Sequence, residues 1–326
     1  MKSKILITGG AGYIGSKIAY DLTDRGYKVV IVDNLTTGHK KLINPKSKFY
    51  KIDILDTEKI SKVINYHGIK NIFHMAASLS VEESMFNKEK YYLNNVEGTR
   101  SLLLASYKKI NNFIFSSTCA VYGQNNNNRI FSEKSLINPI SYYGKTKHLS
   151  ELLIKDFSKN NNINYGILRY FNVAGSDERL RTGCINENGQ LIKNLVTSLK
   201  KRNLKINIYG NSYNTKDGTC IRDYIHVSDL SKIHIECMNL IEKKKKSFVI
   251  NCGYGKGYSV LDIIKNFEKV SNKKFKIYFK KKRKGDAIKI VAETSKLFTK
   301  LGINLNYRGN IKKILSSSID WELKNK

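Results

Sequence analysis

The sequence predicts an α/β protein with a doubly wound parallel β-sheet and a smaller, interleaved C-terminal domain. Short apolar segments alternate with segments of helical periodicity through the first half of the chain, a pattern typical of repeated strand–helix units around one sheet. A glycine-rich turn joins the first strand to the first helix. With 326 residues, the chain is long enough for one larger and one smaller domain.

The first half alternates strand and helix in order. An apolar strand is expected at 4–8, followed by a helix at 13–25 whose apolar residues recur at helical spacing. The next apolar strand, at 28–32, ends in Asp33. The other strands of this half are short apolar runs between polar turns, expected at 48–52, 71–75, 112–116 and 163–169. Its other helices are amphipathic and are expected at 57–66, 91–110 and 142–159.

The second half is less regular from about Phe171 onward. A helix is expected near 191–202 and a short strand at 206–209. Two apolar segments, at 223–227 and 247–251, are expected to be further strands of the sheet. The remaining helices are expected near 259–270 and 310–323.

These elements divide into two domains. We expect the first domain over 1–172, with strands near 223–251 returning to it, and the second mainly over 173–326. The second domain is therefore interleaved with the first. It should lie over the carboxyl ends of the parallel strands, where open α/β sheets bind ligands.

The turn after the first strand has a nucleotide-binding pattern. Gly9, Gly12 and Gly15 are spaced three apart between a strand and a helix. Glycines here permit a tight turn and let the backbone approach a pyrophosphate at the positive end of the helix. Asp33 would accept hydrogen bonds from the adenosine ribose hydroxyls and repel a 2′-phosphate, and Asn34 follows where an NADP enzyme often has Arg. The pattern predicts a Rossmann-type domain that binds NAD and not NADP.

Tyr143 and Lys147 are four residues apart on the helix expected at 142–159. One helical turn places the phenol and the ammonium side by side. A free tyrosine has a pKa of about 10, and an adjacent ammonium favours the phenolate and lowers that pKa. Tyr-x-x-x-Lys alone is common on solvated helix faces, but together with the nucleotide-binding turn it makes Tyr143 a candidate proton shuttle.

The composition argues against several classes of protein. The net charge is +31, from 58 basic and 27 acidic residues, but the lysines are scattered, so no specific nucleic-acid partner is expected. The five cysteines form no Cys-x-x-Cys pair, which argues against a disulfide framework and a zinc site, and no metal is expected. No signal-like or membrane-spanning run is found, so we expect a cytoplasmic protein without a membrane partner.

The motifs resemble, in order and spacing, those of the extended short-chain dehydrogenase/reductase family, and within it the NAD-dependent nucleotide-sugar epimerases. The resemblance covers essentially the entire chain. It is carried by Gly9–Ser16, Asp33–Leu35, Asp53–Ile54, His74–Ala77, Asn94–Thr99, Ser116–Gly123, Tyr143–Lys147, Arg169–Gly175, Arg222–Val227 and Arg283–Asp286. The family implies a homodimer, commonly formed through the helices that precede and carry the Tyr-x-x-x-Lys pair.

By this resemblance, three groups of residues form the site. The catalytic residues would be Thr118, Tyr143 and Lys147. The NAD-binding residues would be Gly9, Gly12, Tyr13, Ile14, Gly15, Asp33, Asn34, Asp53, Ile54, Met75, Ala76, Ala77, Asn94, Tyr143 and Lys147. The residues that hold the UDP-sugar would be Thr118, Tyr143, Asn172, Asn194, Leu195, Tyr209, Arg222, Arg283, Asp286 and Ile290. Some relatives have a cofactor-facing lysine where Leu79 stands here, and that contact is expected to be absent or replaced.

The chemistry of the two arginines agrees with these roles. A diphosphate prefers rigid guanidinium forks, which Arg222 and Arg283 supply. The alternatives are a local ion pair between Arg222 and Asp223 and a solvated basic loop around Arg283. His74 and His226 are flanked by apolar residues in strands, where a core histidine with satisfied hydrogen bonds is the expected role.

The reaction that the resemblance implies is a redox-neutral inversion at carbon 4, which interconverts UDP-glucose and UDP-galactose. Tyr143 would remove the 4-hydroxyl proton while the hydride moves to NAD⁺, and Thr118 would hydrogen-bond the reacting oxygen. A swing of the resulting 4-keto sugar would let the hydride return to the opposite face. Ile290 would face the 2-substituent of the sugar, and its stiff β-branched side chain favours unmodified hexoses.

Other functions stay open at this point. UDP-N-acetylhexosamines and UDP-uronic acids are alternative epimerase substrates. A nucleotide-sugar 4,6-dehydratase or decarboxylase would need an acid or base after Thr118, where Cys119 and Ala120 stand, and a reductase would need its Cys at the place of Ala120. An NAD-sensing protein would not need Thr118, Tyr143 and Lys147 together, and a nucleic-acid binder would need clustered lysines.

Overall fold

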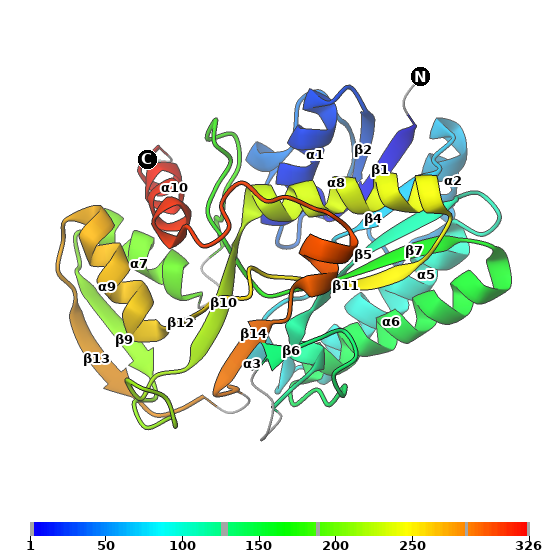
Figure 1. The fold of residues 1–326 in the computed structure, drawn as a ribbon. Coiled ribbons are helices and arrows are strands. Elements are labelled where there is room, and N and C mark those ends of the chain that lie inside the picture. Colours follow the sequence, from blue (N-terminus) through cyan, green and yellow to red (C-terminus); the bar gives the residue numbers. More distant parts are fainter. Residues whose placement is uncertain (1–2, 125–129, 187–189, 284–285, 325–326) are drawn as a thin grey trace. The chain divides into compact units, whose positions relative to one another are not determined.

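The chain folds into two units whose segments alternate along the sequence (Figure 1). The computed structural model describes residues 3–124, 130–186, 190–283 and 286–324. Unit 1 consists of Met1–Val121, Ile137–Arg169 and Ser231–Ile250. Unit 2 consists of Tyr122–Leu136, Tyr170–Leu230 and Asn251–Lys326. One of the crossings between the units, at Arg169–Tyr170, lies near the domain boundary expected at 172.

A seven-stranded sheet runs through unit 1 in the order β11-β7-β5-β4-β1-β2-β3. Its strands are β1 (Lys4–Thr8), β2 (Lys28–Val32), β3 (Lys48–Tyr50), β4 (Asn71–His74), β5 (Asn112–Thr118), β7 (Asn164–Tyr170) and β11 (Phe248–Cys252). In β1, Leu6 lies opposite Val30 of β2 and Ile72 of β4, and both pairings are parallel. β4 and β5 are buried throughout, as expected for strands covered on both faces. The doubly wound parallel sheet predicted from the sequence is confirmed.

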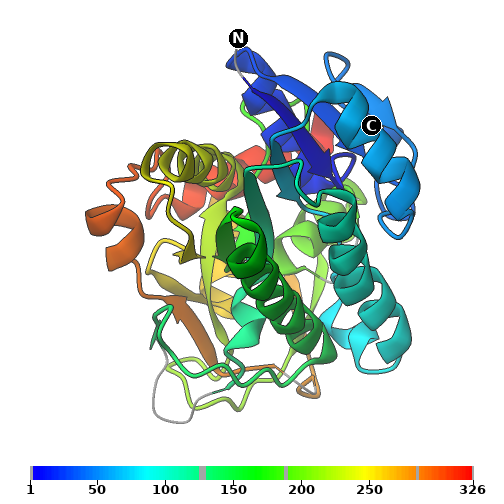
Figure 2. The same cartoon turned by 90° about the vertical axis from the view of Figure 1, so that its right-hand side faces the viewer.

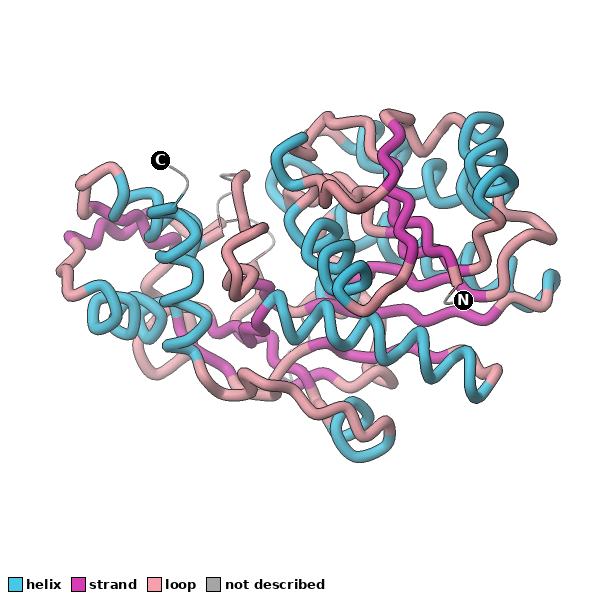
Figure 3. Tube along the Cα trace, turned by 90° about the horizontal axis from the view of Figure 1, so that it is seen from above, coloured by secondary structure: helices cyan, strands magenta, loops and turns pink. Residues whose placement is uncertain are grey.

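Helices cover both faces of this sheet (Figure 3). The helices and helical turns of this part are α1 (Tyr13–Asp24), η1 (Lys40–Leu42), α2 (Thr57–His67), α3 (Val81–Ser84), α4 (Lys88–Tyr91), η2 (Tyr92–Glu97), α5 (Gly98–Ala105), η3 (Cys119–Val121), α6 (Tyr142–Asn161) and α8 (Val227–Lys244). Helix α5 packs between α2 and α6, and Figure 2 shows α5 beside the green helix α6. On the other face, the His234 ring of α8 lies 6.0 Å from the Phe73 ring of β4. No helix in the described part of the chain is both long and apolar enough to cross a membrane.

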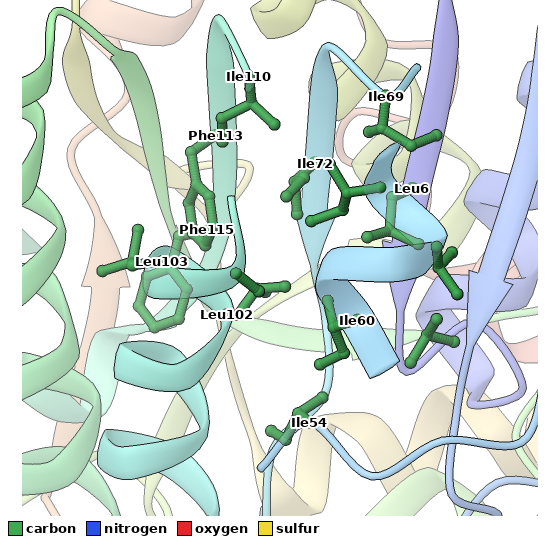
Figure 4. Packing of buried hydrophobic residues seen from close by; sticks show 14 of the residues in the cluster. Leu6, Ile54, Ile60, Ile69, Ile72, Leu102, Leu103, Ile110, Phe113 and Phe115 are labelled. Carbon is green, nitrogen blue, oxygen red and sulfur yellow. The ribbon is translucent and has the colours of Figure 1, made fainter. Parts of the chain in front are cut away.

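The core on the side of α2, α5 and α6 is one apolar cluster (Figure 4). Leu6, Ile72 and Phe113 project into it from three neighbouring strands. Ile60 of α2 and Leu102 of α5 meet them from the helical side. Because side chains alternate between the two faces of a strand, every second residue of these strands packs here. The cluster therefore holds the helices of this face against the sheet.

Unit 2 contains two small sheets. Strands β12, β10, β14 and β6 lie in that order, β8 also pairs with β10, and β9 and β13 form a separate parallel pair. The strands are β6 (Ile130–Phe131), β8 (Asn172–Ala174), β9 (Lys205–Tyr209), β10 (Ile221–His226), β12 (Gly257–Ser259), β13 (Lys276–Lys280) and β14 (Lys289–Ala292). The helices are α7 (Leu191–Lys200), α9 (Val260–Ser271), η4 (Lys296–Lys300) and α10 (Ile311–Lys324). Buried Asp223 of β10 accepts hydrogen bonds from the backbone N–H groups of Tyr254, Gly255 and Ala292, which fastens the neighbouring segments to β10.

Two expectations about these elements are corrected by the structure. The helix expected at 91–110 is divided into the end of α4, the π-helical turn η2 and α5, which ends at Ala105. Within this turn, the Asn95 side chain bonds to Ser78 and to Thr146 in other segments. The strand expected at 223–227 is β10, which pairs with β8, β12 and β14 and not with the seven-stranded sheet. Its apolar pattern identifies a strand but not the strands it pairs with.

A buried ion pair joins α6 to the seven-stranded sheet. Arg169 of β7 donates from Nε to Oε1 of Glu151 at 2.9 Å and from Nη2 to Oε2 at 2.6 Å. Ser117 Oγ of β5 donates to Oε1 of the same carboxylate at 2.5 Å. Burial favours a higher pKa for Glu151, but the Arg169 guanidinium outweighs burial and holds the pKa below its usual value. Glu151 is therefore a carboxylate at neutral pH.

Replacing Glu151 by Gln should lower the free energy of unfolding at neutral pH by about 3–5 kcal/mol, because the Arg169 charge is left buried without its counter-ion. Folding lowers the pKa of Glu151, so its stabilisation is present above the usual value of 4.5 and is lost as the pH falls through the folded-state pKa. Urea unfolding should therefore show a smaller difference between Glu151→Gln and the unmodified protein at about pH 4 than at about pH 7.

Glu58→Gln is the matched control for this prediction. Glu58 pairs with Lys62 on α2, and both side chains are exposed. Its loss should leave the free energy of unfolding nearly unchanged, because water screens an exposed ion pair. Equal effects of the two substitutions at neutral pH would contradict the role given to the buried pair.

Candidate active site

The turn between β1 and α1 is shaped to receive a phosphate group. Gly9 has a left-handed backbone with φ +70°, and a Cβ built on it would lie 2.6 Å from the backbone nitrogen of Ala76. A Cβ on Gly15 would overlap the carbonyl oxygen of Gly9. The turn is tightly folded without side chains and leads into the N-terminus of α1, where N–H groups and the helix dipole favour an anion. The cap and the first residues of this helix are Gly12, Tyr13 and Ile14.

Asp33 lies beside this turn, directly after β2. Its Oδ2 accepts a hydrogen bond from Ala11 N at 3.0 Å, and its Oδ1 accepts one from Leu35 N at 2.8 Å. Burial raises the pKa of its carboxyl group, and the two backbone N–H groups offset that rise only in part. Each carboxylate oxygen has a further lone pair, so the side chain is suited to accept hydrogen bonds from the two hydroxyls of a ribose. The turn and Asp33 together fit a dinucleotide.

Asn34, Asp53 and Ile54 follow neighbouring strands at the same side of unit 1. Asn34 Nδ2 donates to Asp53 Oδ2 at 2.8 Å, so the structure brings these two expected cofactor residues together. The side chain of Ile54 is buried in the apolar cluster, against Gly98. Only the backbone of Ile54 is therefore left for contact with a ligand.

The segment after β4 packs against the glycine-rich turn. Met75 N donates to the carbonyl oxygen of Thr8 at 3.0 Å. Asn95 of η2 holds the segment in place, because its Oδ1 accepts from Ser78 N at 2.8 Å and its Nδ2 donates to Ser78 O at 3.1 Å. Asn94 donates to Asn95 Oδ1 at 3.1 Å. The sequence singled out Asn94 and missed Asn95, since two adjacent amides have the same pattern. The residues of this segment expected at the cofactor are half-buried: Met75, Ala76 and Ala77.

Thr118, Tyr143 and Lys147 come together where β5 ends and α6 begins. Helix α6 begins after Ser141, whose side chain caps the first turn. Thr118 Oγ1 accepts a hydrogen bond from the backbone N–H of Ala120 at 3.1 Å, and its side chain hydrogen-bonds the hydroxyl group of Tyr143. Lys147 is buried on the next turn of α6. Its Nζ lies 3.5 Å from Ser116 Oγ of β5. The structure therefore brings Thr118 and Tyr143 together and places Lys147 beside the same strand.

The pKa values of Tyr143 and Lys147 differ from the expectation. Burial raises the pKa of Tyr143, and the hydrogen bond with Thr118 offsets the rise only in part. Burial lowers the pKa of Lys147 to about 7, although the Glu151 carboxylate acts in the opposite direction. The expected lowering of the tyrosine pKa is wrong for the chain by itself, because desolvation disfavours the charged form of each group. A phenolate at Tyr143 needs additional positive charge.

Four of the residues expected to hold the nucleotide lie together in unit 2. The Arg283 guanidinium stacks on the ring of Tyr209, 3.8 Å from its centroid. Arg222 Nη2 lies 3.5 Å from Asp286 Oδ1. The alternative pairing of Arg222 with Asp223 is not found, since the Asp223 carboxylate bonds to backbone N–H groups. Two positive and one negative side chain thus share this part of unit 2.

The other expected substrate residues lie on three elements of unit 2. Asn172 in β8 is opposite Tyr224 of β10, and Ile290 in β14 is opposite Arg222 of the same strand. Leu195 of α7 is fully buried, so its side chain packs in the core. Of these residues, the strand pairing places Ile290 next to Arg222. Asn194 lies in α7. Lys284 and Gly285, which belong to the motif at Arg283–Asp286, lie outside the described residues.

Tyr213 joins this group of unit 2, although the sequence did not single it out. Lys282 Nζ lies 4.6 Å from the centroid of the Tyr213 ring. The hydroxyl group of Tyr213 and the Nε of Arg283 are buried and have no hydrogen-bond partner in the described part of the chain. Buried donors without partners are costly, so they mark a place where the acceptor groups of a ligand would be stabilising. Tyr213 lies in an irregular loop, where no periodic pattern indicates a buried side chain.

The buried histidines have hydrogen-bond partners within the fold. His226 Nε2 lies 3.1 Å from Ser317 Oγ, and the ring nitrogens of His74 lie within hydrogen-bonding distance of Thr8 and Thr99. Among the residues that the structure describes, no group of three or more His, Cys, Asp or Glu side chains is placed to hold a metal ion.

Comparisons with known proteins agree in family and in fold. Residues 5–253 match the NAD dependent epimerase/dehydratase family. The UDP-glucose 4-epimerase of Lactobacillus helveticus is 38% identical over 323 residues, which cover 98% of this chain and 96% of that protein. The structure of UDP-glucose 4-epimerase from Brucella ovis in complex with NAD has a TM-score of 0.92 at 34% identity and covers 98% of each chain. The UDP-Glc/GlcNAc 4-epimerase of Campylobacter jejuni has a TM-score of 0.84 at 37% identity, with 99% of this chain and 100% of that chain covered.

Gly9→Ala should weaken NAD⁺ binding at least about tenfold, because the new Cβ displaces the turn from Ala76 and from the pyrophosphate. Gly26→Ala is the matched control, since Gly26 also has a positive φ, +79°, but no atom within 4 Å of its Cβ position. Both substitutions should cost about 1 kcal/mol of stability from backbone strain, and Gly9→Ala should cost more because its Cβ also overlaps the backbone of Ala76. Calorimetric titration with NAD⁺ separates them, and equal affinities in the two variants would exclude this turn as the NAD site.

Proposed function

Because the chain belongs to the NAD dependent epimerase/dehydratase family, we propose that it interconverts UDP-glucose and UDP-galactose by inversion at carbon 4, with NAD as its cofactor. The observation that carries this proposal is the group of Thr118, Tyr143 and Lys147 within the unit that also holds the glycine-rich turn. Relatives named for this activity are similar over nearly the whole chain, which supports the choice of substrate.

The residues of this group have complementary roles in the proposed reaction. NAD⁺, when bound, supplies the acceptor for the carbon-4 hydride and a positive charge. Tyr143 accepts the proton of the 4-hydroxyl group and returns it after the inversion. With substrate bound, Thr118 would donate its one hydroxyl proton to the reacting oxygen in place of the Tyr143 hydroxyl. Lys147 is cationic below its pKa of about 7 and then favours the phenolate of Tyr143.

The nucleotide has to stay bound while the 4-keto sugar turns. We assign the diphosphate to Arg222 and Arg283, because planar guanidinium groups pair with two phosphate oxygens at once. The stacking of Arg283 on Tyr209 holds one of these groups in place. The hydroxyl group of Tyr213, which has no hydrogen-bond partner among the described residues, offers a further donor. The amides of Asn172 and Asn194 and the backbone of Leu195 complete the proposed set.

A nucleotide-sugar 4,6-dehydratase is the second candidate, because it shares the fold, the cofactor and the first oxidation. Its further steps need an acid or a base next to the residue at the place of Thr118. In this chain Thr118 is followed by Cys119 and Ala120, and neither is a useful proton donor or acceptor at carbons 5 and 6. Epimerisation is therefore the reaction that these residues support better.

We propose that two copies of the chain associate through α5 and α6. Leu104 of α5 and Leu152 of α6 are each 47% exposed, and Leu149 of α6 is 40% exposed. Large apolar side chains that gather on two adjacent helices are typical of a surface that a partner covers. A homodimer would bury this surface without a second kind of protein.

The composition bears on location and on other partners. None of the five cysteines, all of which lie in the described part of the chain, forms a disulfide bond. Reduced thiols are typical of a reducing compartment, and we propose the cytoplasm. The positive charge is spread along the sequence and not confined to one segment. We therefore propose the UDP-sugar as the ligand beside NAD, with no specific nucleic acid.

Tyr143→Phe should reduce the turnover of UDP-galactose by at least about 10²-fold, because it removes the general base, while NAD⁺ still binds at the glycine-rich turn. Tyr142→Phe, at the neighbouring position of α6, is the matched control and should keep its turnover. A coupled assay of UDP-glucose formation measures both variants. Near-normal turnover by Tyr143→Phe would show that another residue moves the proton.

Ile290 bears on which sugars are accepted. Its side chain is buried in β14, next to Arg222 of β10. β-Branching restricts its rotamers, so it cannot easily move aside for a bulky 2-substituent. We propose that unmodified hexoses are preferred over acetamido sugars, although the Campylobacter jejuni relative is named for both UDP-Glc and UDP-GlcNAc.

Ile290→Ser should raise kcat/KM for UDP-N-acetylglucosamine relative to UDP-glucose by about tenfold or more, because one small group in a pocket discriminates by about 1–3 kcal/mol. Ile290→Val keeps the β-branch and should keep the preference of the unmodified protein. Steady-state assays with both sugars decide the matter. An unchanged ratio in Ile290→Ser would remove this position from the account of specificity.

A further inference from the structure

A buried series of hydrogen bonds connects the glycine-rich turn with the catalytic helix through His74. Thr8 Oγ1, in the residue before Gly9, lies 2.7 Å from His74 Nδ1. His74 Nε2 lies 3.0 Å from Thr99 Oγ1 of α5. The three side chains are 0%, 1% and 0% exposed. The roles proposed for Thr118, Tyr143 and Lys147 use none of them.

The direction of each hydrogen bond in this series follows from the donors present. Thr99 Oγ1 donates its one proton to the carbonyl oxygen of Asn95 at 2.6 Å, since a carbonyl only accepts. His74 Nε2 must therefore carry a hydrogen and donate to Thr99. Burial, together with the charge of Lys147, lowers the pKa of His74 to about 3, so the ring is neutral. Its Nδ1 then has no hydrogen and accepts from the hydroxyl group of Thr8.

The series continues into α6, at Thr146 beside Lys147 and at Ser150 one helical turn further on. The carbonyl oxygen of Asn95 also accepts from Ser150 Oγ at 3.0 Å, and Asn95 Nδ2 donates to Thr146 Oγ1 at 3.1 Å. Ser150 Oγ lies 3.0 Å from the carbonyl oxygen of Thr146 as well. Asn95 belongs to the π-helical turn η2, and turns of this kind are frequent at functional sites.

The other end of the series holds the segment that faces the glycine-rich turn. The backbone N–H of Ala76 donates to Thr8 Oγ1 at 3.5 Å. The His74 ring also lies 5.6 Å from the ring of Phe115, and Lys147 Nζ lies 4.2 Å from the centroid of that same Phe115 ring. His74 thus contacts Thr8, which precedes the glycine-rich turn, and Phe115, which packs against Lys147.

We propose that His74 is a positioning residue, whose two ring nitrogens hold the glycine-rich turn and the catalytic helix at a fixed separation. This inference rests on the proposed epimerase function. Its Nδ1 side sets the turn that receives the pyrophosphate of NAD, and its Nε2 side sets α6 through Thr99 and Asn95. A displacement of about 1 Å of a catalytic group can cost about 10²-fold in rate, so the separation matters for turnover.

Replacing His74 by Asn or by Gln tests its hydrogen bonds to Thr8 and to Thr99 one at a time. The amide of Asn reaches the place of Nδ1 and keeps an acceptor for Thr8, whereas the amide of Gln reaches the place of Nε2 and keeps a donor for Thr99. His74→Asn should keep the NAD⁺ dissociation constant within about threefold and lower kcat by about tenfold or more. His74→Gln should keep kcat within about threefold and raise the NAD⁺ dissociation constant by about tenfold. Calorimetric titration of NAD⁺ and steady-state kinetics at saturating NAD⁺ measure the two effects.

His234→Gln is the control for replacing a buried histidine. His234 is fully buried in α8 of the same unit. The His234→Gln protein should be less stable, but its kcat and its NAD⁺ affinity should not change. If both His74 variants keep kcat and NAD⁺ affinity, as His234→Gln should, or if both change kcat and the NAD⁺ dissociation constant equally, then His74 only packs the core. Either result would overturn the inference. An unmodified protein without epimerase activity would overturn the proposed function instead, and the NAD⁺ titrations would still decide the Nδ1 side.

Thr99 provides the same test if the His74 variants do not fold. Thr99→Val removes the hydroxyl group at nearly constant volume, and Thr99→Ser restores it. Thr99→Val should lower kcat by about tenfold with NAD⁺ affinity retained, and Thr99→Ser should stay within about threefold of the unmodified protein. Equal kcat in the Val and Ser variants would contradict the inference.

Discussion

The buried ion pair between Glu151 and Arg169 holds α6, which carries Tyr143 and Lys147, against the strands of unit 1. Glu151 is one helical turn beyond Lys147 on α6, and its carboxylate also accepts from Ser117, the residue before Thr118 in β5. Separating charges that are buried to this extent is costly, so the helix and the strand cannot shift past each other without a large loss of stability. These buried bonds therefore fix the position of the first turns of α6 relative to the end of β5.

The same burial that fixes these residues also controls their charge. Desolvation raises the pKa of Tyr143 and lowers that of Lys147 to about 7, so neither charged form is favoured in the chain by itself. Glu151 opposes this effect at Lys147. In the proposed reaction, a nicotinamide cation bound beside Tyr143 would oppose it there. Binding of the cofactor and formation of the phenolate would then be coupled electrostatically.

Local patterns predicted the parts of the site that depend on short segments. The glycine-rich turn, Asp33 and the Tyr143–Lys147 pair could be found in the sequence, because strand, turn and helix follow each other there within a few residues. The partner strands of β10 and the burial of Tyr213 depend on contacts between distant segments, which periodicity does not report. The direction of the Tyr143 pKa was missed for the same reason, since desolvation is set by the surrounding fold.

UDP-glucose with deuterium at carbon 4 gives the most direct test of the proposed reaction. If the hydride leaves carbon 4 and returns to the opposite face without meeting solvent, the UDP-galactose formed in ordinary water should retain deuterium at carbon 4. Mass spectrometry and proton NMR of the product show where the label is. Loss of the deuterium to water, or no UDP-galactose at all, would contradict the account.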